Sequence, residues 1–364
     1  MRKFAITTTA VTAVALLALA GCSTPRGDTG GGDGDAAGFD AGSVIGVALP
    51  DKTSENWTIA GGLFEDAIAE AGFEANVQYA GSTSPAPDQQ AQISTMIEDG
   101  AKVIVIGAFD SKSLGAQLKE AADQGVTIIA YDRLLEESEN VDYYVAFDNY
   151  KVGQLQGEAL VEGLKAARAE GPYNVELFSG AATDPNAAVF FNGAMSVLQP
   201  LIDSGEIVIP STETTVEQTA TEGWDGPTAQ ERMDTILQGS YQGLTIDGVL
   251  APNDNLARYI LTSVADAGQG PIVITGQDSE AASIPLIVDG TQYMTIYKDT
   301  RKLVAQTLSM ITELSKGDEA TTNNETDNTA KKVPTFYLDP IVVTKDNAAD
   351  VYKDNDKLYP LTQG

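Results

Sequence analysis

Short apolar runs alternate along this chain with longer stretches whose apolar residues recur at helical spacing. In the first such pair, residues 44–49 predict a buried strand, and the apolar residues of 59–71 fall on one helical face. Gly72 follows and favours a helix end there. Further strands are predicted at 75–80, 102–108, 126–131, 143–147, 174–179, 207–210, 248–251, 272–276, 293–297 and 336–343.

This alternation predicts the fold class. Strands that alternate with helices of this length indicate βαβ units, so we predict an α/β protein with parallel-rich sheets. The pattern restarts at 143, with one helix from about 150 and another at 303–314. We interpret 321–327 as a polar loop. The chain is long enough for two ordinary domains, and it shows the same architecture twice without a repeated motif.

Polar clusters follow four of the predicted strands. In open α/β sheets, ligands bind in the crevice beyond the carboxyl ends of the strands. Carboxylates, amides and an arginine gathered there suit a ligand covered in hydroxyl groups, so the pattern favours a receptor for a small sugar. The clusters are Tyr131-Asp132-Arg133, Phe147-Asp148-Asn149, Pro252-Asn253-Asp254 and Gly276-Gln277-Asp278.

Composition removes several function classes. The chain has no histidine and one cysteine, which excludes an internal disulfide, a zinc site and a histidine-based triad. Its formal charge of −30 repels nucleic acid and anionic headgroups but does little to a neutral sugar. The simpler interpretation of that charge is solubility after export. We expect no cofactor, no metal and no nucleic-acid partner. Composition alone leaves a carboxylate-only enzyme open.

The N-terminal residues indicate where the protein is located. Arg2 and Lys3 precede an apolar stretch at 10–20, and Leu19-Ala20-Gly21-Cys22 resembles the lipobox of bacterial lipoproteins. We therefore expect a signal peptide at 1–21, acylation of Cys22, and a Gly- and Asp-rich flexible tether at 22–42. This places the protein outside the cytoplasm, anchored to the outer face of the cell membrane or in the periplasm. The alternative is an ordinary signal peptide with a chance cysteine.

Taken together, five runs resemble the sugar-binding periplasmic proteins of ABC importers, in the ribose, xylose and glucose-galactose branch. The chain looks most like the multiple-monosaccharide group that includes xylose-binding proteins, over nearly everything from Val44 onward. The runs are Ala130-Tyr131-Asp132-Arg133, Ala146-Phe147-Asp148-Asn149, Phe191-Asn192-Gly193-Ala194-Met195, Gly276-Gln277-Asp278 and Tyr297-Lys298-Asp299-Thr300-Arg301.

The resemblance implies two similar doubly wound lobes, three crossovers between them and a ligand cleft that closes on the sugar by a hinge. By this analogy the N-terminal lobe is 43–149 plus 299–333. The C-terminal lobe is 150–298 plus 334–364. We expect a monomer.

Several candidate ligands follow the strands. The carboxylate of Asp132 is expected to accept hydrogen bonds from sugar hydroxyls, and the Arg133 guanidinium is expected to donate them. The alternative is a salt bridge between the two residues. By family analogy Asp278 binds the sugar, with helix N-capping as the alternative. Asn253 is favoured as a contact, because an amide both donates and accepts, whereas Asp254 is left even between contact and cap.

The only two tryptophans, Trp57 and Trp224, are predicted to stack on the apolar face of a pyranose, with core packing as the alternative. Polar neighbours predict that each lies in a loop. Asn56 joins this site and departs from the resemblance, since close relatives often carry an arginine just before this tryptophan. The sugar preference is expected to differ as a result.

The remaining candidates come from the resemblance. Asp184 and Asn186 match a second-lobe ligand position, although the sequence there also suits a turn. Lys298 is expected to reach a ring oxygen or hydroxyl, unless it is a solvated surface lysine. Asp148 and Asn149 are assigned to the hinge or cleft.

The sequence therefore predicts a solute-binding lipoprotein that delivers a pyranose pentose or hexose, such as xylose, glucose, galactose or arabinose, to an ABC permease. The first alternative is a sensor, of a sugar or an autoinducer-2-like compound, for chemotaxis or a membrane kinase. A sugar-responsive repressor would need a DNA-binding head where the signal peptide lies. A glycosidase is the weaker account, because the cleft acids sit beside basic or amide groups.

Overall fold

The computed structural model describes residues 38–50, 52 and 54–363. The predicted signal peptide, Cys22 and most of the expected tether lie outside these residues. None of the helices in the described part combines the length and hydropathy that a membrane crossing requires.

A seven-stranded sheet organises the first lobe, and its strands run in the order β11-β12-β5-β4-β3-β1-β2. Every neighbouring pair is parallel except β11 with β12. The strands are β1 (Val44–Leu49), β2 (Glu74–Tyr79), β3 (Val103–Ile106), β4 (Thr127–Tyr131), β5 (Tyr143–Phe147), β11 (Asn324–Asp327) and β12 (Lys332–Leu338).

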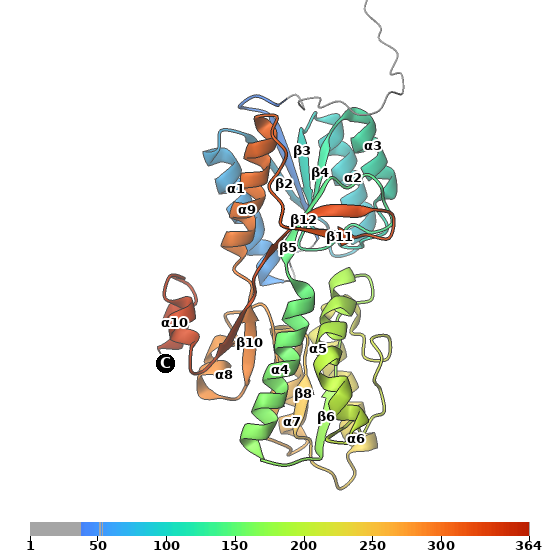
Figure 1. The fold of residues 1–364 in the computed structure, drawn as a ribbon, viewed down its shortest axis with the longest axis vertical. Helices are drawn as coiled ribbons and strands as arrows, with labels where there is room; N and C mark the ends of the chain where they lie inside the picture. Colours follow the sequence, from blue (N-terminus) through green and yellow to red (C-terminus); the bar gives the residue numbers. More distant parts are fainter. Residues whose placement is uncertain (1–37, 51, 53, 364) are drawn as a thin grey trace, which may run out of the picture. The chain divides into compact units, whose positions relative to one another are not determined.

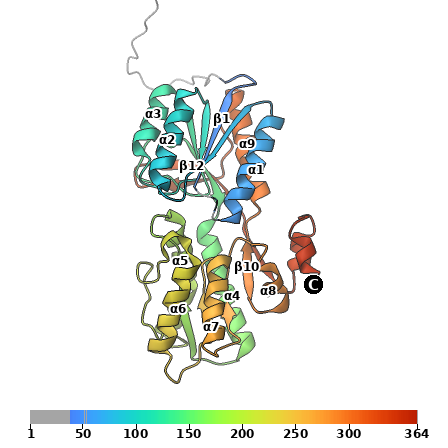
Figure 2. The same ribbon diagram turned by 180° about the vertical axis from the view of Figure 1, so that it is seen from behind.

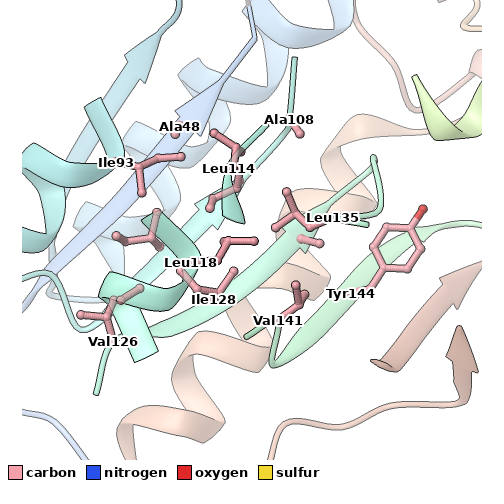
Figure 3. Packing of buried hydrophobic residues seen from close by; sticks show 14 of the residues in the cluster. Ala48, Ile93, Ala108, Leu114, Leu118, Val126, Ile128, Leu135, Val141 and Tyr144 are labelled. Carbon is pink, nitrogen blue, oxygen red and sulfur yellow. The ribbon is translucent and has the colours of Figure 1, made fainter. Parts of the chain in front are cut away.

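Helices cover both faces of this sheet (Figures 1 and 2). Helices α1 (Glu55–Glu70) and α9 (Thr300–Ser315) lie on one face, and α2 (Pro85–Glu98) and α3 (Gly115–Gln124) lie on the other. Alternate residues of β3 accordingly enter two different cores, which explains why its sequence is a continuous apolar run. Figure 3 shows the core beneath α2 and α3, where Ile93, Leu118 and Ile128 meet.

The second lobe is built on a parallel four-stranded sheet in the order β7-β6-β8-β9. Its strands are β6 (Tyr173–Leu177), β7 (Ile207–Val208), β8 (Gly248–Leu250) and β9 (Val273–Ile274). Its long helices are α4 (Asn149–Ala167), α5 (Pro185–Asp203), α6 (Gly226–Ser240) and α7 (Asp254–Asp266). Glycines let α4 and α5 pack closely, because a Cβ at Gly153 or Gly193 would meet backbone of the other helix.

A smaller antiparallel pair of strands stands beside the four-stranded sheet (Figure 1). It consists of β10 (Met294–Tyr297) and β13 (Ile341–Thr344), next to α8 (Ile284–Asp289) and α10 (Ala348–Tyr352). The 3-10 turns η1 (Glu222–Trp224) and η2 (Tyr359–Thr362) complete the described elements.

Two element predictions near the C-terminus are wrong. The expected loop at 321–327 contains β11, which pairs antiparallel with β12. The expected single strand at 336–343 is two strands that belong to different sheets. Pro340 separates them, because it has no backbone N–H to continue a ladder.

This changes the expected lobe boundary between residues 333 and 334. Residues Thr335–Leu338 pair in parallel with Tyr144–Phe147, so β12 lies in the first sheet throughout. The chain leaves this sheet only after Leu338. Its other two connections between the lobes run from β5 into α4 and from β10 into α9, and each is only one or two residues long.

Candidate ligand-binding site

A cavity of about 350 Å³ is lined by side chains from both lobes. This volume is within the usual range for sites that hold small molecules. All the residues expected to bind the ligand line it, with the exception of Asp254. These residues are Asn56, Trp57, Asp132, Arg133, Asp184, Asn186, Trp224, Asn253, Asp278 and Lys298.

Asp254 is the exception because its side chain turns away from the cavity. One carboxylate oxygen accepts from Gln292 Nε2 at 2.7 Å, and the other accepts from Thr295 Oγ1 at 3.0 Å and from the Glu280 N–H at 2.9 Å. Burial, with a smaller contribution from the charge of Glu280, raises the pKa of the Asp254 carboxyl well above its usual value. Asp254 is therefore neither a ligand contact nor the cap of α7.

Asn253 is that cap. Its Oδ1 accepts from the Leu256 N–H at 3.0 Å while the side chain also lines the cavity. Asn253 therefore caps α7, and contact between its side chain and a ligand stays a prediction.

Asp148 and Asn149 lie beside the cavity and are not part of its lining. Asp148 caps α4 by accepting from the Lys151 N–H at 3.0 Å. Asn149 is buried and donates from Nδ2 to Asn186 Oδ1 at 2.9 Å, which ties the start of α4 to a cavity residue. A bracing role near the hinge remains the prediction for this pair.

Arg133 pairs across the cavity with Asp184, 2.9 Å from Nε to Oδ2, and not with its neighbour Asp132. The same Asp184 oxygen accepts from Trp224 Nε1 at 3.1 Å, and the other oxygen caps α5 through the Asn186 N–H. Burial raises the pKa of the Asp184 carboxyl, and the positive charge of Arg133 offsets part of that rise. One buried carboxylate thus orients an arginine, an indole and a helix.

Lys298 is buried between two carboxylates, so it is not a solvated surface lysine. Its Nζ lies 3.2 Å from Asp278 Oδ1 and 4.0 Å from Asp132 Oδ2, and it stands 5.4 Å from the ring centre of Phe190. Burial on its own lowers the pKa of the Lys298 amine, but the two carboxylates outweigh it and the net shift is upward. The amine is therefore charged at neutral pH and remains a hydrogen-bond donor.

Asp278 follows β9 with a backbone φ of 91°, in a conformation that favours glycine. No helix starts at this point, because α8 begins only at Ile284 with Ser283 as its N-cap residue. The capping alternative for Asp278 is therefore wrong. Its carboxylate faces the cavity beside Lys298 instead.

The expectation that Trp57 lies in a loop is also wrong. Trp57 is in the first turn of α1 and is only 8% exposed, with its ring centre 6.2 Å from that of Tyr131 and 5.4 Å from the Arg133 guanidinium carbon. The polar residues around it form the start of a helix, where Ser54 is the N-cap residue and Glu55 lies in the first turn.

Trp224 is half-buried and ends a 3-10 turn at a φ of 54°. Its ring occupies space that a side chain at Gly180 would fill, as the ring of Trp57 does at Gly107. The ring of each tryptophan therefore packs directly against a glycine that follows a strand.

Several cavity residues were not anticipated from the sequence. Phe190 had a usable signal, because it follows Asn186 by one helical turn on the same face of α5. Gln277 stands in one of the polar clusters but was not selected. The other unanticipated aromatic and polar residues are Ser54, Phe109, Tyr131, Phe147, Thr183, Glu222 and Thr300.

A family model described as the periplasmic binding protein domain matches residues 45–319. The chain belongs to this family. The resemblance inferred from the five sequence runs and the predicted α/β fold class are both confirmed.

Curated relatives and solved structures agree with this assignment. The chain is 43% identical, over 84% of its length and 87% of the relative's, to the multiple sugar-binding periplasmic receptor ChvE of Rhizobium radiobacter. It is 34% identical, over 85% of its length and 89% of the relative's, to the D-xylose-binding periplasmic protein of Escherichia coli. A solute-binding protein of an ABC transporter from Clostridium phytofermentans, solved with bound β-D-glucose, superposes with a TM-score of 0.83 at 37% identity, covering 88% of this chain and all of that one.

Proposed function

We propose that this periplasmic binding protein binds an uncharged monosaccharide in the cavity and delivers it to the permease of an ABC importer. The single observation that carries the proposal is the convergence of carboxylates, amides, cations and two indoles from both lobes on one cavity. The relatives are described as sugar-binding and xylose-binding proteins, and a similar structure contains glucose; both support the substrate class.

Each group has a task in this proposal. Asp132 and Asp278 accept hydrogen bonds from sugar hydroxyls, while Arg133 and Lys298 donate them. Asn253 offers an amide on the same wall, and the indoles cover the apolar faces of the ring. Several charge-assisted hydrogen bonds at roughly 1.5–3 kcal/mol each suffice for micromolar binding.

The charges in the cavity favour a neutral sugar over an acidic one. Asp132, Asp184 and Asp278 outnumber the two cations, Arg133 and Lys298, that face them. A sugar carboxylate would meet this excess of negative charge where water is largely excluded, which is unfavourable.

Contacts across the cavity support closure on the ligand. Asn186 Nδ2 in the second lobe donates to the Asp132 backbone oxygen in the first at 3.1 Å. At the rim, the Ala281 N–H donates to Glu55 Oε2 at 3.2 Å. Contacts of this kind exist only when the lobes are shut, so a sugar that touches both lobes stabilises the shut state.

The proposal includes the location and the oligomeric state of the protein. Acylated Cys22 holds the protein at an outer membrane face, and the protein acts as a monomer without a cofactor and without a nucleic-acid partner. It binds the sugar without altering it, since each of the three cavity aspartates is engaged by a cation or an amide. A second candidate function, sugar sensing for chemotaxis or a membrane kinase, is favoured by the word receptor in the name of the Rhizobium relative.

Fluorescence titration tests the proposal directly, because the only two tryptophans of the chain both line the cavity. We expect a saturable change with a neutral pentose or hexose, and at least about tenfold weaker binding of the matching uronic acid. Asp278→Asn serves as the site control and should lose most of the affinity. Absence of binding across a panel of aldoses, or release of product from a labelled disaccharide, would overturn the proposal.

A further inference from the structure

The loop that presents Asp278 has an unfavourable backbone. Asp278 and Ser279 have φ values of 91° and 53°, and neither is glycine. L-residues avoid this region because the Cβ crowds the backbone, and two in succession persist only where surrounding contacts hold them. The position of the Asp278 carboxylate therefore depends on whatever holds this loop.

Four hydrogen bonds hold it, from three separate parts of the second lobe. The Asp278 N–H donates to the Ile296 backbone oxygen at 2.9 Å, and the Ser279 N–H donates to Thr295 Oγ1 at 3.2 Å. The Glu280 N–H donates to Asp254 Oδ2 at 2.9 Å. The fourth bond comes from the C-terminal helix α10, where the Tyr352 hydroxyl donates to Ser279 Oγ at 2.6 Å.

The second and third bonds belong to one connected network. The Thr295 hydroxyl donates a hydrogen bond to Asp254 Oδ2 at 3.0 Å while its oxygen accepts from the Ser279 N–H. Asp254 also donates its backbone N–H to the Gln277 oxygen at 3.0 Å, just before the loop. The network thus explains why Asp254 is fully buried although it does not line the cavity.

Tyr352 connects the loop to the neighbouring segment that contains Tyr297 and Lys298. Its ring packs edge-on against Tyr297 with 5.1 Å between centres, and Tyr297 immediately precedes Lys298. Asn355, shortly after Tyr352, donates to the Tyr297 hydroxyl at 3.1 Å. One side chain outside the cavity therefore touches both segments that bring Asp278 and Lys298 within 3.2 Å of each other.

We propose that Tyr352 is a positioning residue of the sugar site: its hydroxyl fixes the strained loop through Ser279 and so sets the place of the Asp278 carboxylate. Thr295 and Asp254 act with it from the other side of the loop. This inference rests on the proposed sugar site.

Tyr352→Phe removes only the hydroxyl, and Tyr173→Phe is the matched control. Tyr173 is a buried tyrosine of the same lobe whose hydroxyl also makes a 2.6 Å hydrogen bond, to the Arg168 oxygen, but it does not line or adjoin the loop. We expect Tyr352→Phe to weaken the binding of a sugar that the wild type binds by roughly tenfold, the effect of one buried hydrogen bond. Tyr173→Phe should bind as the wild type does.

Two further readouts separate positioning from general stability. Hydrogen exchange at the amides of 278–280 in the ligand-free protein should accelerate in Tyr352→Phe and in Thr295→Val, but not in the control. In an Asp278→Asn background, Tyr352→Phe should add little further loss of affinity, because its effect passes through that carboxylate.

Wild-type affinity or unchanged loop exchange in Tyr352→Phe would overturn the inference, as would an undiminished penalty in the Asp278→Asn background. If the wild type binds none of the sugars, the proposed function fails, and the exchange comparison still decides whether Tyr352 holds the loop.

Discussion

Each lobe contributes one tryptophan to the cavity, and the two are held in different ways. Trp57 is almost completely buried and belongs to a hydrophobic core of the first lobe together with Phe64 and Tyr131. Trp224 is half-buried, lies on a left-handed backbone and is fixed by the hydrogen bond from its Nε1 to Asp184. Trp57 is therefore held by burial in a core, whereas Trp224 packs only against the edges of two cores and has a polar anchor in addition.

This difference indicates that the two tryptophans contribute unequally to the stability of the fold, although both line the binding site. A packed indole cannot be removed without leaving a cavity in the core, so Trp57 serves both folding and the site. A half-buried indole at the edge of a core, held in part by a carboxylate, can be released with less cost to the fold. Asp184 in turn spans the cleft by pairing with Arg133 of the first lobe, so it couples the anchor of Trp224 to closure.

The largest effect is expected from removing each indole in turn. Trp57→Ala should lower the free energy of unfolding of the ligand-free protein by about 3–5 kcal/mol, the usual cost of a large core truncation. Trp224→Ala should cost clearly less, and both variants should lose most of their sugar affinity. Urea unfolding and ligand titration measure the two quantities separately. Equal destabilisation by the two variants would break the comparison.

Asp184→Asn tests the polar anchor. With the amide oxygen kept on the helix cap, an NH2 group replaces the oxygen that accepts from Arg133 and Trp224 Nε1, so both of these bonds are lost. Because hydrogen bonds to charged groups contribute roughly 1.5–3 kcal/mol, we expect sugar affinity to fall by about one to two orders of magnitude. The fluorescence of Trp224, read in a Trp57→Phe background, should shift toward that of a more mobile indole. An unaltered Trp224 signal would show that packing, not Asp184, holds it.

Glycine-to-alanine substitutions beneath the two rings test whether Trp57 is packed more rigidly than Trp224. A Cβ at Gly107 would lie 2.8 Å from Trp57 Cζ3, and one at Gly180 would meet the ring of Trp224 still more closely. Overpacking of this kind costs typically about 1–3 kcal/mol when the neighbour cannot move. Gly107→Ala should therefore reduce both stability and affinity.

For Gly180→Ala we expect reduced affinity with a smaller loss of stability, because Trp224 has room to shift toward solvent. Gly115→Ala is the control, since a Cβ there meets no other atom within 4 Å. Thermal unfolding and titration of the three variants would show the difference, and equal loss of stability at Gly107 and Gly180 would count against it.

The smallest effect concerns pH. The chain has no histidine, so affinity should change little between about pH 6 and about pH 8. Burial raises the pKa of Asp184, so this carboxyl gains its proton at a higher pH than an ordinary aspartate. Affinity should then fall as the pH drops through that raised pKa, because a neutral Asp184 no longer attracts Arg133.

Stability should respond to Asp184 in the opposite direction. A raised pKa in the folded state means that the folded protein binds this proton more tightly than the unfolded chain does. Its contribution to stability is complete below the unfolded pKa and is lost as the pH rises through the folded pKa. Titrations and melting curves at matched pH values check both signs, and a tenfold change in affinity between about pH 6 and about pH 8 would contradict the assignment.

Much of the site was predictable because it follows from rules about chain segments. Strand ends in a wound sheet meet at one edge, so Asp132, Asn253 and Asp278 were found from the residues that follow apolar runs. The predictions that were wrong concern residues that are adjacent in the sequence but whose side chains point in different directions. Asn253 faces the cavity while Asp254 turns under the Asp278 loop, and no periodicity distinguishes the two.

The sequence by itself determined the alternation of strands and helices, because the spacing of apolar residues encodes which local structure buries them. It also determined the family, through five short runs of which four lie at strand ends. Only the tertiary structure decided that Arg133 pairs with the distant Asp184 and not with the adjacent Asp132, that β12 pairs with β5 in the first sheet, and that the Tyr352 hydroxyl bonds the loop of Asp278. The physical reason is that such contacts depend on which distant segments converge, and local spacing carries no record of that.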